Sequence, residues 1–310
     1  MRHGLIMQDK TVLVTGAGGF IGRQTLQPLI DLGYKVHGVS RGQDPNMPHV
    51  QWHACDLLNA SATDELIAKL RPSHLLHLAW YAEHGKFWTA PENTAWLEAS
   101  IHLFEKFIAC GGQRILGTGT CAEYDWQRQD RTPWKETDPC KPHTLYGQVK
   151  LALLQKLAAM PVSYAWARIF LLFGEGEKPT RLVPYTIQQA LAGKDILCSE
   201  GTQIRDFIDT RICGGALAQL LDSDVTGPVN IGSGEAISLA DLVKQICALC
   251  DYDGNIKFGA VPMNKSEPFF MVPDLSRLRN EVKFTERQDT RAALSEIITG
   301  WRRESGKKKL

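Results

Sequence analysis

The sequence predicts an α/β protein whose main part is a doubly wound parallel sheet, followed by a smaller mixed α/β region. Three observations predict this class. Short apolar segments alternate with amphipathic helical segments over about the first 175 residues, the first apolar segment runs into a glycine-rich turn, and the alternation stops after Gly174. Strands that alternate with helices form parallel sheets with helices on both faces, because each crossover is right-handed.

The expected strands are short, continuous apolar segments that end at a glycine, an acid or a polar turn residue. Such runs suit strands that helices cover on both faces. In chain order, the expected strands are residues 11–16, 34–40, 50–56, 74–80, 114–120, 162–174 and 228–234.

The expected helices lie between these strands and have recognisable ends. Gly33 follows the first helix and Gly111 the third, and glycine commonly terminates a helix. Ser61 and Ser238 each stand three positions before an acidic residue, which is a helix start signal. In chain order, the expected helices are residues 20–32, 61–70, 91–110, 145–160 and 238–250.

The composition excludes several classes of protein. Of 310 residues, 44% are hydrophobic and 22% are charged, and the net charge of +1 gives no reason to expect nucleic acid as a partner. No apolar run approaches the roughly 20 residues of a membrane span, and the polar first ten residues do not resemble a signal peptide. We therefore expect a cytoplasmic protein without a membrane partner.

The eight cysteines are scattered along the chain, and we expect them to be reduced. Cys247 and Cys250 form a single CxxC pair without the second pair that a zinc site needs, so no metal is expected.

A glycine loop joins the first expected strand to the first expected helix. Gly16, Gly19 and Gly22 follow the strand, with Phe20 and Ile21 at the start of the helix. A helix N-terminus behind a tight, side-chain-free turn offers backbone N–H groups to a pyrophosphate. The loop therefore predicts a dinucleotide site.

The second strand of such a site ends near the adenosine ribose, where an acidic residue favours NAD. This strand ends with Ser40 and Arg41 and has no acid, which favours NADP(H), with NAD(H) as the alternative. Asp56 and its neighbour Leu57 follow the third strand and are expected at the adenine, although Asp56 could instead cap the next segment. Ala79, near the end of the fourth strand, is a further expected cofactor contact.

Tyr146 and Lys150 stand four residues apart on an expected helix and so share one face. An ammonium group beside a phenol lowers the pKa of the phenol, which makes it a usable acid or base. Packing of the same two side chains is the alternative reading of this spacing.

Together these motifs resemble the extended short-chain dehydrogenase/reductase family, which contains nucleotide-sugar epimerases, dehydratases and reductases. Residues 167–170, 201–210 and 229–235 also match it, so the resemblance covers nearly the whole chain. It implies that Tyr146 is the general acid/base, that Lys150 bonds the nicotinamide ribose, and that Thr120 hydrogen-bonds the reacting oxygen.

The resemblance also implies a division of the chain. Residues 1–175, with a return at about 206–232, would form the Rossmann-type dinucleotide domain. Residues 176–205 and 233–310 would form the smaller substrate-binding region. The helices at 91–110 and 145–160 would pair with those of a second copy, as a four-helix bundle in a homodimer.

The residues after Thr120 discriminate between activities of the family. Dehydratases carry two carboxylates where this chain has Cys121 and Ala122, and Glu123 is shifted by one residue towards the opposite face of the strand, if the strand continues that far. The Thr–Tyr–Lys set alone suffices for hydride transfer at sugar C4. We therefore expect an NAD(P)H-dependent reductase of a nucleotide-linked 4-keto-6-deoxy sugar, with a 4-epimerase that holds NAD tightly as the alternative and a non-catalytic dinucleotide-sensing regulator as a third hypothesis.

Substrate contacts are expected from two segments. Arg205 matches the family arginine that binds the substrate diphosphate, whereas an ion pair at the surface is its structural alternative. The aromatic segment 80–96 would line the sugar site with Tyr81, His84 and Asn93, or else pack beneath a long loop. Leu171 stands where the family often has a substrate-binding Asn, so the sugar contacts here differ from that pattern.

Overall fold

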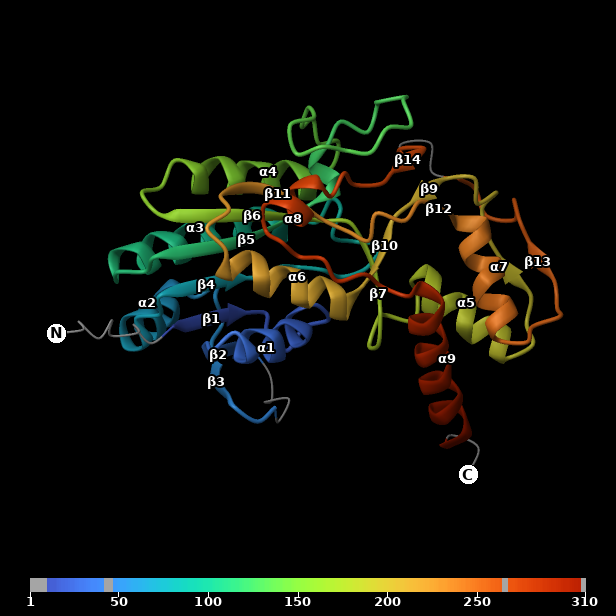
Figure 1. The fold of residues 1–310 in the computed structure, drawn as a ribbon, viewed down its shortest axis with the longest axis horizontal. Helices are drawn as coiled ribbons and strands as arrows, with labels where there is room; N and C mark the ends of the chain where they lie inside the picture. The colour runs from blue at the N-terminus through green and yellow to red at the C-terminus, as the bar shows by residue number, and fades with distance from the viewer. Residues whose placement is uncertain (1–9, 42–46, 264–266, 308–310) are drawn as a thin grey trace.

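The computed structural model describes residues 10–41, 47–263 and 267–307, and these form two lobes (Figure 1). The larger lobe holds a parallel sheet between layers of helices. The smaller lobe gathers α5 (Leu182–Leu191), α7 (Leu239–Leu249) and α9 (Thr290–Lys307) at one end of the molecule. The predicted fold class is therefore confirmed.

Within the described residues, seven parallel strands form the main sheet, in the order β11–β6–β5–β4–β1–β2–β3. The order runs outward from β1 in both directions, as in doubly wound folds. The strands are β1 (Thr11–Thr15), β2 (Lys35–Ser40), β3 (Val50–Ala54), β4 (His74–His77), β5 (Arg114–Thr120), β6 (Ser163–Ile169) and β11 (Gly227–Ile231).

Helices cover both faces of this sheet. The apolar residues of α1 (Gly22–Asp31) and α6 (Thr210–Asp222) form one core, and those of α2 (Ala60–Leu70), α3 (Glu92–Ala109) and α4 (Leu145–Ala158) form the other. All seven residues of β5 are buried, which requires apolar cover on each of its faces. The end of this central strand is thereby fixed between two packed layers.

The prediction of one strand over 162–174 is wrong. The segment divides at Phe170 into β6 and β7 (Leu171–Phe173), and β7 pairs with β10 (Phe207–Asp209) outside the main sheet. Phe170 is buried in a separate small cluster with Tyr124, Trp134 and Met271. That cluster holds the point at which the chain passes from the main sheet towards the smaller lobe.

Other strands are also shorter than predicted, and the last strand of the main sheet ends at Ile231 rather than at residue 234. The third ends at Ala54 rather than at residue 56, and the fourth ends at His77 rather than at residue 80. Beyond His77, the Thr15 hydroxyl accepts hydrogen bonds from the backbone N–H groups of Leu78 and Ala79. The Leu78 N–H also donates to the Thr15 carbonyl oxygen at 3.2 Å, and Ala79 lies in the loop that passes the end of β1.

The helix starts are also partly as predicted. Ser238 caps α7 by accepting a hydrogen bond from the Asp241 N–H, as the sequence indicates. The cap of α2 is Asn59 rather than Ser61, because the Asn59 side chain accepts from the Ala62 N–H.

The smaller lobe has its own core and short strands. Its apolar core joins α5, α7 and α9. The short strands are β8 (Ile196–Leu197), β9 (Ile204–Arg205), β12 (Ile237–Ser238), β13 (Ile256–Lys257) and β14 (Phe270–Met271), whereas the short helix α8 (Ser276–Asn280) packs beside β11 in the larger lobe. Asp206, directly after β9, accepts hydrogen bonds from Ser233 and Gly234, so the segments 201–210 and 229–235 meet beside Arg205.

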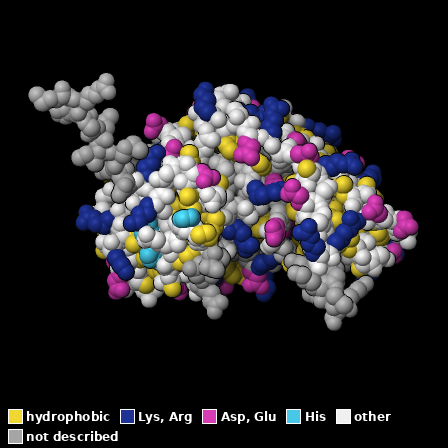
Figure 2. Space-filling view, turned by 60° about the horizontal axis from the view of Figure 1, so that its bottom comes forward, with side chains coloured by type: hydrophobic (Ala, Val, Ile, Leu, Met, Phe, Trp, Pro, Cys, Tyr) yellow, Lys and Arg dark blue, Asp and Glu magenta, His cyan; other side chains and the backbone are white. Residues whose placement is uncertain are grey.

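The face in Figure 2 carries basic and acidic side chains interspersed with small apolar groups. No helix within the described part of the chain is long and apolar enough to cross a membrane.

A buried carboxylate fixes the end of β5. The strand does not continue past Thr120, because Cys121–Glu123 forms a short 3-10 turn (η1). Glu123 is fully buried: its carboxylate accepts from the Thr120 N–H at 2.9 Å and from the Arg168 Nε at 2.8 Å. The Trp166 indole donates to the same carboxylate at 3.0 Å. Glu123 is therefore a structural residue, not a side chain on the opposite face of an extended strand.

Replacing Glu123 with alanine should lower the free energy of unfolding by about 3–5 kcal/mol, because it leaves the Arg168 charge buried and unpaired. Urea unfolding followed by circular dichroism measures this loss. The control is Glu281→Ala, which breaks an exposed pair with Arg277 on α8 and should cost no more than about 1 kcal/mol. Equal losses in the two variants would contradict the role assigned to Glu123.

Candidate active site

The glycine loop closes tightly against the neighbouring strand end. Gly16 has a positive φ of 68°, and a Cβ there would lie 2.9 Å from the Ala79 backbone nitrogen. A Cβ on Gly22 would lie 2.1 Å from the Gly16 carbonyl oxygen. Side chains at these two positions would therefore prevent the turn from forming, which accounts for both glycines.

The helix that follows this loop suits a phosphate group. Gly19 is exposed, Ile21 precedes the first helical residue, and no side chain caps the N-terminus of α1. Phe20, beside Ile21, is partly buried. The first N–H groups of a helix attract anions when side chains do not satisfy them. The residues present therefore fit the diphosphate of a dinucleotide.

The residues expected at the adenosine lie at neighbouring strand ends. Ser40 is the last residue of β2, and Arg41 follows it with an exposed side chain. Asp56 is exposed and accepts a hydrogen bond from the Leu58 N–H, so it also caps the following segment. Leu57 is buried in the core beside it. Arg41 and Asp56 thus lie on the accessible edge where an adenosine would be bound.

The structure brings Thr120, Tyr146 and Lys150 together. Thr120 ends β5, and Tyr146 and Lys150 lie one turn apart on α4, which Thr144 caps. The Thr120 hydroxyl hydrogen-bonds to Tyr146. The Lys150 Nζ donates to the Thr118 carbonyl oxygen at 2.9 Å, which ties the helix to the same strand. Two hydroxyl groups and one ammonium group therefore converge at one strand end.

The pKa values at this point differ from the expectation. Burial raises the pKa of Tyr146, and the Glu123 and Cys121 charges raise it further, whereas the Thr120 hydrogen bond and Arg181 lower it. Burial lowers the pKa of Lys150 to about 7, against the opposing effect of Glu123. The predicted depression of the tyrosine pKa by Lys150 is therefore not found here, because desolvation dominates at both groups.

Trp80 explains part of this burial. Its indole lies over the Lys150 Nζ, 3.6 Å from the ring centroid, and its Nε1 donates to Asn93 Oδ1 at 2.9 Å. Asn93 is fully buried, and its amide nitrogen donates to the Phe87 and Ala90 carbonyl oxygens. Asn93 thus holds the aromatic loop in place, and the structure gives it no free polar atom for a substrate.

Aromatic side chains stand around the Tyr146 phenol. The Phe87 ring lies edge-on at 5.0 Å and the Trp88 ring at 5.9 Å from the Tyr146 ring. Trp126 lies 5.8 Å from Trp88 and donates its Nε1 to the Cys121 carbonyl oxygen. Segment 80–96 therefore does both things that the sequence left open: Trp96 is buried as packing, and Trp88 stands at the phenol.

Other predicted substrate residues lie in the same loop with partners of their own. Tyr81 donates to Glu83, and His84 shares a hydrogen bond with Thr180. Sequence reasoning missed Trp126 and Arg181. No motif or spacing in the sequence indicated Trp126. Arg181 could have been suspected, because it is the charged residue directly before the apolar helix 182–191.

Arg205 is buried close to the reacting end of β5. Its Nη1 donates to the Ile204 and Phe269 carbonyl oxygens, and its Nη2 donates to Glu267 at 3.1 Å. Its charge acts on Cys121, the residue after Thr120. The pairing with Glu267 is thus the ion pair that the sequence held as the alternative, although Glu267 is largely exposed and Arg205 lies at the site.

A cavity of about 460 Å³ opens beside the Arg205–Glu267 pair in the smaller lobe. Gln203, on its wall, is buried, and its Oε1 has no hydrogen-bond partner. Apolar side chains form much of the remaining wall, including Leu182, Leu197, Phe258, Val261 and Met263. The size and the mixed lining suit a small organic ligand.

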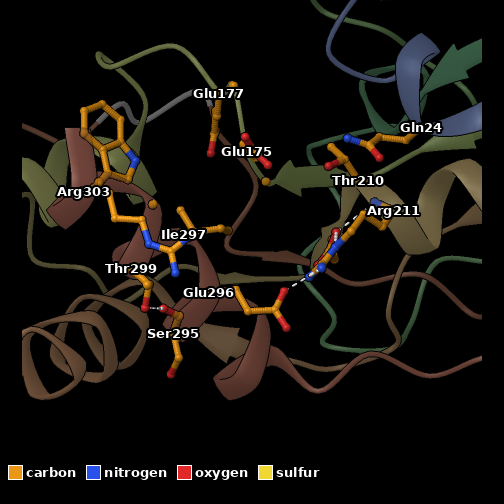
Figure 3. Close-up of a pocket in the computed structure, with 15 residues that line it drawn as sticks. Gln24, Glu175, Glu177, Thr210, Arg211, Ser295, Glu296, Ile297, Thr299 and Arg303 are labelled. Atoms are coloured by element: carbon orange, nitrogen blue, oxygen red, sulfur yellow. Dashed lines mark hydrogen bonds and ion pairs between the residues drawn. The ribbon is translucent and has the colours of Figure 1, made fainter. Parts of the chain in front are cut away.

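A second cavity, of about 690 Å³, lies apart from the three converging groups, between α1, the start of α6 and α9 (Figure 3). Arg211 crosses it, bonded to Asp209 and Glu296. Burial raises the pKa of Glu177 on its wall to about 7, and the Glu177 carboxylate accepts from Arg181. None of Thr120, Tyr146 and Lys150 lines this cavity.

No group of three or more His, Cys, Asp or Glu side chains suited to a metal occurs within the described ranges. Cys247 and Cys250 are buried at the end of α7, in the core of the smaller lobe.

Comparison with known proteins gives consistent findings. Residues 12–232 match the model of the NAD dependent epimerase/dehydratase family. The UDP-glucose 4-epimerase of Rhizobium meliloti (strain 1021) is 23% identical over 334 residues, covering 97% of this chain and 100% of that protein. The UDP-N-acetylglucosamine 4-epimerase structure from Methanobrevibacter ruminantium M1 has a TM-score of 0.83 at 24% identity, covering 96% of this chain and 100% of that one. The NAD complex of the UDP-glucose 4-epimerase from Thermus thermophilus has a TM-score of 0.83 at 19% identity, covering 94% of this chain and 99% of that one.

The buried Lys150 predicts a pH-dependent stability. Its pKa is about 7 in the folded chain and about 10.4 when unfolded, so between these values the unfolded state binds a proton that the folded state lacks. The contribution of Lys150 to stability is therefore lowest below pH 7 and rises with pH up to about 10. Across this window, the free energy of unfolding of the wild type minus that of Lys150→Met should increase by about 1 kcal/mol per pH unit.

Urea unfolding of both proteins at several pH values measures this difference. Lys156→Met is the control, because Lys156 is an exposed lysine on the same helix. A difference between wild type and Lys150→Met that stays constant from pH 7 to 10 would contradict the burial of a neutral amine.

Proposed function

Because the chain belongs to the NAD dependent epimerase/dehydratase family, an enzyme family of the extended short-chain dehydrogenase/reductase type, we propose that it is a nucleotide-sugar 4-epimerase that keeps its dinucleotide bound. One observation carries this proposal. The Thr120 and Tyr146 hydroxyl groups meet beside Lys150 while the buried Glu123 carboxylate is occupied by its own partners, and relatives of the chain named as 4-epimerases favour epimerisation by this set.

The convergent hydroxyl groups can move one proton at one sugar oxygen. Tyr146 takes the proton of the C4 hydroxyl as the carbon–hydrogen bond breaks, and Thr120 donates a hydrogen bond to the oxygen that becomes a carbonyl. A bound dinucleotide would accept the hydride from C4 and return it. Once the ketosugar had turned in the site, Tyr146 would return the proton to the C4 oxygen as the carbon–hydrogen bond re-forms on the other face, which would give the C4 epimer with no net oxidation.

Elimination of water is disfavoured by the same geometry. Dehydration needs an additional acid and base at neighbouring carbons, and the nearest carboxylate, Glu123, is fully committed to Thr120, Trp166 and Arg168. Burial raises the pKa of the Cys121 thiol to about 12, so the thiol stays protonated near neutral pH and is a poor base.

The path of a nucleotide sugar follows from the positions of the polar groups. The sugar would lie at Tyr146, the diphosphate at Arg205, and the base in the cavity of about 460 Å³ beside Glu267. Arg205 would give up its ion pair with the exposed Glu267 and bind the diphosphate instead. The planar guanidinium group can make two parallel hydrogen bonds to a phosphate group. The orphaned Gln203 Oε1 offers an acceptor to a base that carries N–H groups.

On this path, the two parts of the chain would bind different ligands. Residues 1–175 and about 206–232 would bind the dinucleotide, and 176–205 and 233–310 would bind the nucleotide. The relatives named as UDP-glucose and UDP-N-acetylglucosamine 4-epimerases support a UDP-linked hexose as the substrate.

A reductase is the second candidate, and one observation favours it. Ser40 and Arg41 stand at the end of β2 without an acid, which suits a 2′-phosphate and an exchangeable NADP(H). The reductase would use the same Thr120, Tyr146 and Lys150 to reduce a 4-keto-6-deoxy sugar.

We also expect a homodimer through α3 and α4, which pack together and leave Leu97, Ile101 and Leu151 partly exposed. Light scattering at micromolar concentration tests this arrangement.

Incubation with UDP-glucose and UDP-galactose tests the epimerase. We expect each sugar to convert into the other without added dinucleotide and without net change at 340 nm, and NAD to be recovered from the denatured protein. Tyr146→Phe should lower the rate by at least about 100-fold, because the proton-transfer group is lost. Stoichiometric consumption of NADPH with a 4-keto-6-deoxy sugar would replace the epimerase with the reductase.

Replacing Arg41 with alanine tests the cofactor. If the enzyme binds NADP(H), the variant should bind NADP⁺ about 10- to 100-fold more weakly, because a charge-assisted contact with the 2′-phosphate is lost, while binding of NAD⁺ stays unchanged. Fluorescence titration measures both. Equal affinities of the wild type and the variant for NADP⁺ would assign Arg41 to the solvated surface.

A further inference from the structure

Trp88 is unusual among the tryptophans of this chain. It is 36% exposed, whereas Trp96, Trp134 and Trp166 are 6%, 1% and 0% exposed. It nevertheless stands at the Tyr146 ring, 5.9 Å away between centroids, and not on an outer surface of its own. An exposed indole beside the candidate proton-transfer group leaves a large apolar face available to whatever that group acts on.

The backbone holds Trp88 in this position. Its carbonyl oxygen accepts the Tyr146 N–H at 3.1 Å, and α4 begins at this point. The preceding residue, Phe87, packs on the indole at 4.3 Å, and the buried Asn93 amide holds the Phe87 carbonyl oxygen. The indole is therefore preorganised, and little conformational entropy remains to be lost when a ligand covers it.

The chemistry of the surrounding groups identifies the part of a ligand that Trp88 would cover. Thr120 and Tyr146 hydrogen-bond to each other and would both reach one oxygen of the reacting carbon. The rings of Phe87 and Trp88 supply apolar area beside the same phenol, and Trp126 packs against Trp88. A pyranose ring combines both features, because its hydroxyl groups lie around the edge and its carbon–hydrogen bonds form apolar faces.

We propose that Trp88 is the platform on which the hexose ring of the substrate packs. This inference rests on the proposed nucleotide-sugar function and deepens it. Contact with an aromatic face is non-directional, so it holds a ring without fixing whether the C4 hydroxyl is axial or equatorial. A platform of this kind suits an enzyme that must bind both C4 epimers and let the ketosugar turn between them.

The experiment separates the sugar from the nucleotide. NAD⁺-saturated wild type, Trp88→Leu and Trp88→Phe are titrated calorimetrically with UDP, UDP-glucose and UDP-galactose. In the wild type, both sugars should bind more tightly than UDP. In Trp88→Leu, the affinity for both UDP-sugars relative to UDP should fall about tenfold, and the affinity for UDP itself should not change. Trp88→Phe should keep most of the relative affinity for the two sugars.

Trp301→Ala is the matched control, because it removes a partly buried indole from α9, away from Tyr146. It should keep the full gain, and circular dichroism establishes that each variant is folded. An unchanged ratio of sugar to UDP affinity in Trp88→Leu overturns the platform while leaving the nucleotide-sugar assignment standing. Failure of the wild type to bind UDP or either sugar overturns the assignment itself, and the platform with it.

Discussion

The Glu123 carboxylate is the group on which the geometry of the candidate site depends. It satisfies the Thr120 N–H, the Trp166 indole and the Arg168 guanidinium at once, with no exposed surface of its own. Because a buried carboxylate is tolerated only when its lone pairs are used, this arrangement has one stable solution. These bonds anchor the turn at which β5 ends, so a structural carboxylate sets the position of Thr120 in the candidate site.

The same low-polarity surroundings oppose the charged forms of Lys150 and Tyr146, although a proton-transfer group must be able to ionise. An amine under an indole and a phenol between aromatic rings both favour their neutral forms, which is why burial dominates their pKa values. A phenol that must give and take a proton needs a neighbour whose charge lowers its pKa. Arg181 does this from the smaller lobe, and an oxidised nicotinamide, which is cationic, would do it more strongly. Desolvation thus makes the site's proton chemistry depend on what is bound.

Short sequence motifs were enough to predict those parts of the candidate site that depend on only a few neighbouring residues. The glycine loop, the Tyr146–Lys150 spacing and the strand ending at Thr120 follow from helix and strand periodicity, and the fold class follows from their order. The partners that decide their behaviour lie far away in sequence. Arg168 is 45 residues from Glu123, and Glu267 is 62 residues from Arg205. Trp80 lies in the loop after β4, which ends at His77, and its indole contacts Lys150 on α4. No periodicity records such contacts, so the environment of each predicted residue had to come from the fold.

The loop after β7 connects the chemistry of the two lobes. Glu177 lines the cavity of about 690 Å³, and its ion pair with Arg181 spans one turn of chain at the start of α5. Arg181 in turn acts on Tyr146, and Leu182, the next residue, lines the cavity proposed for the nucleotide base. A nucleotide that packed against Leu182 would therefore lie next to the residue whose charge lowers the pKa of Tyr146. This loop also carries the chain from one lobe to the other, so a residue of the smaller lobe acts on a phenol that α4 holds in the larger lobe.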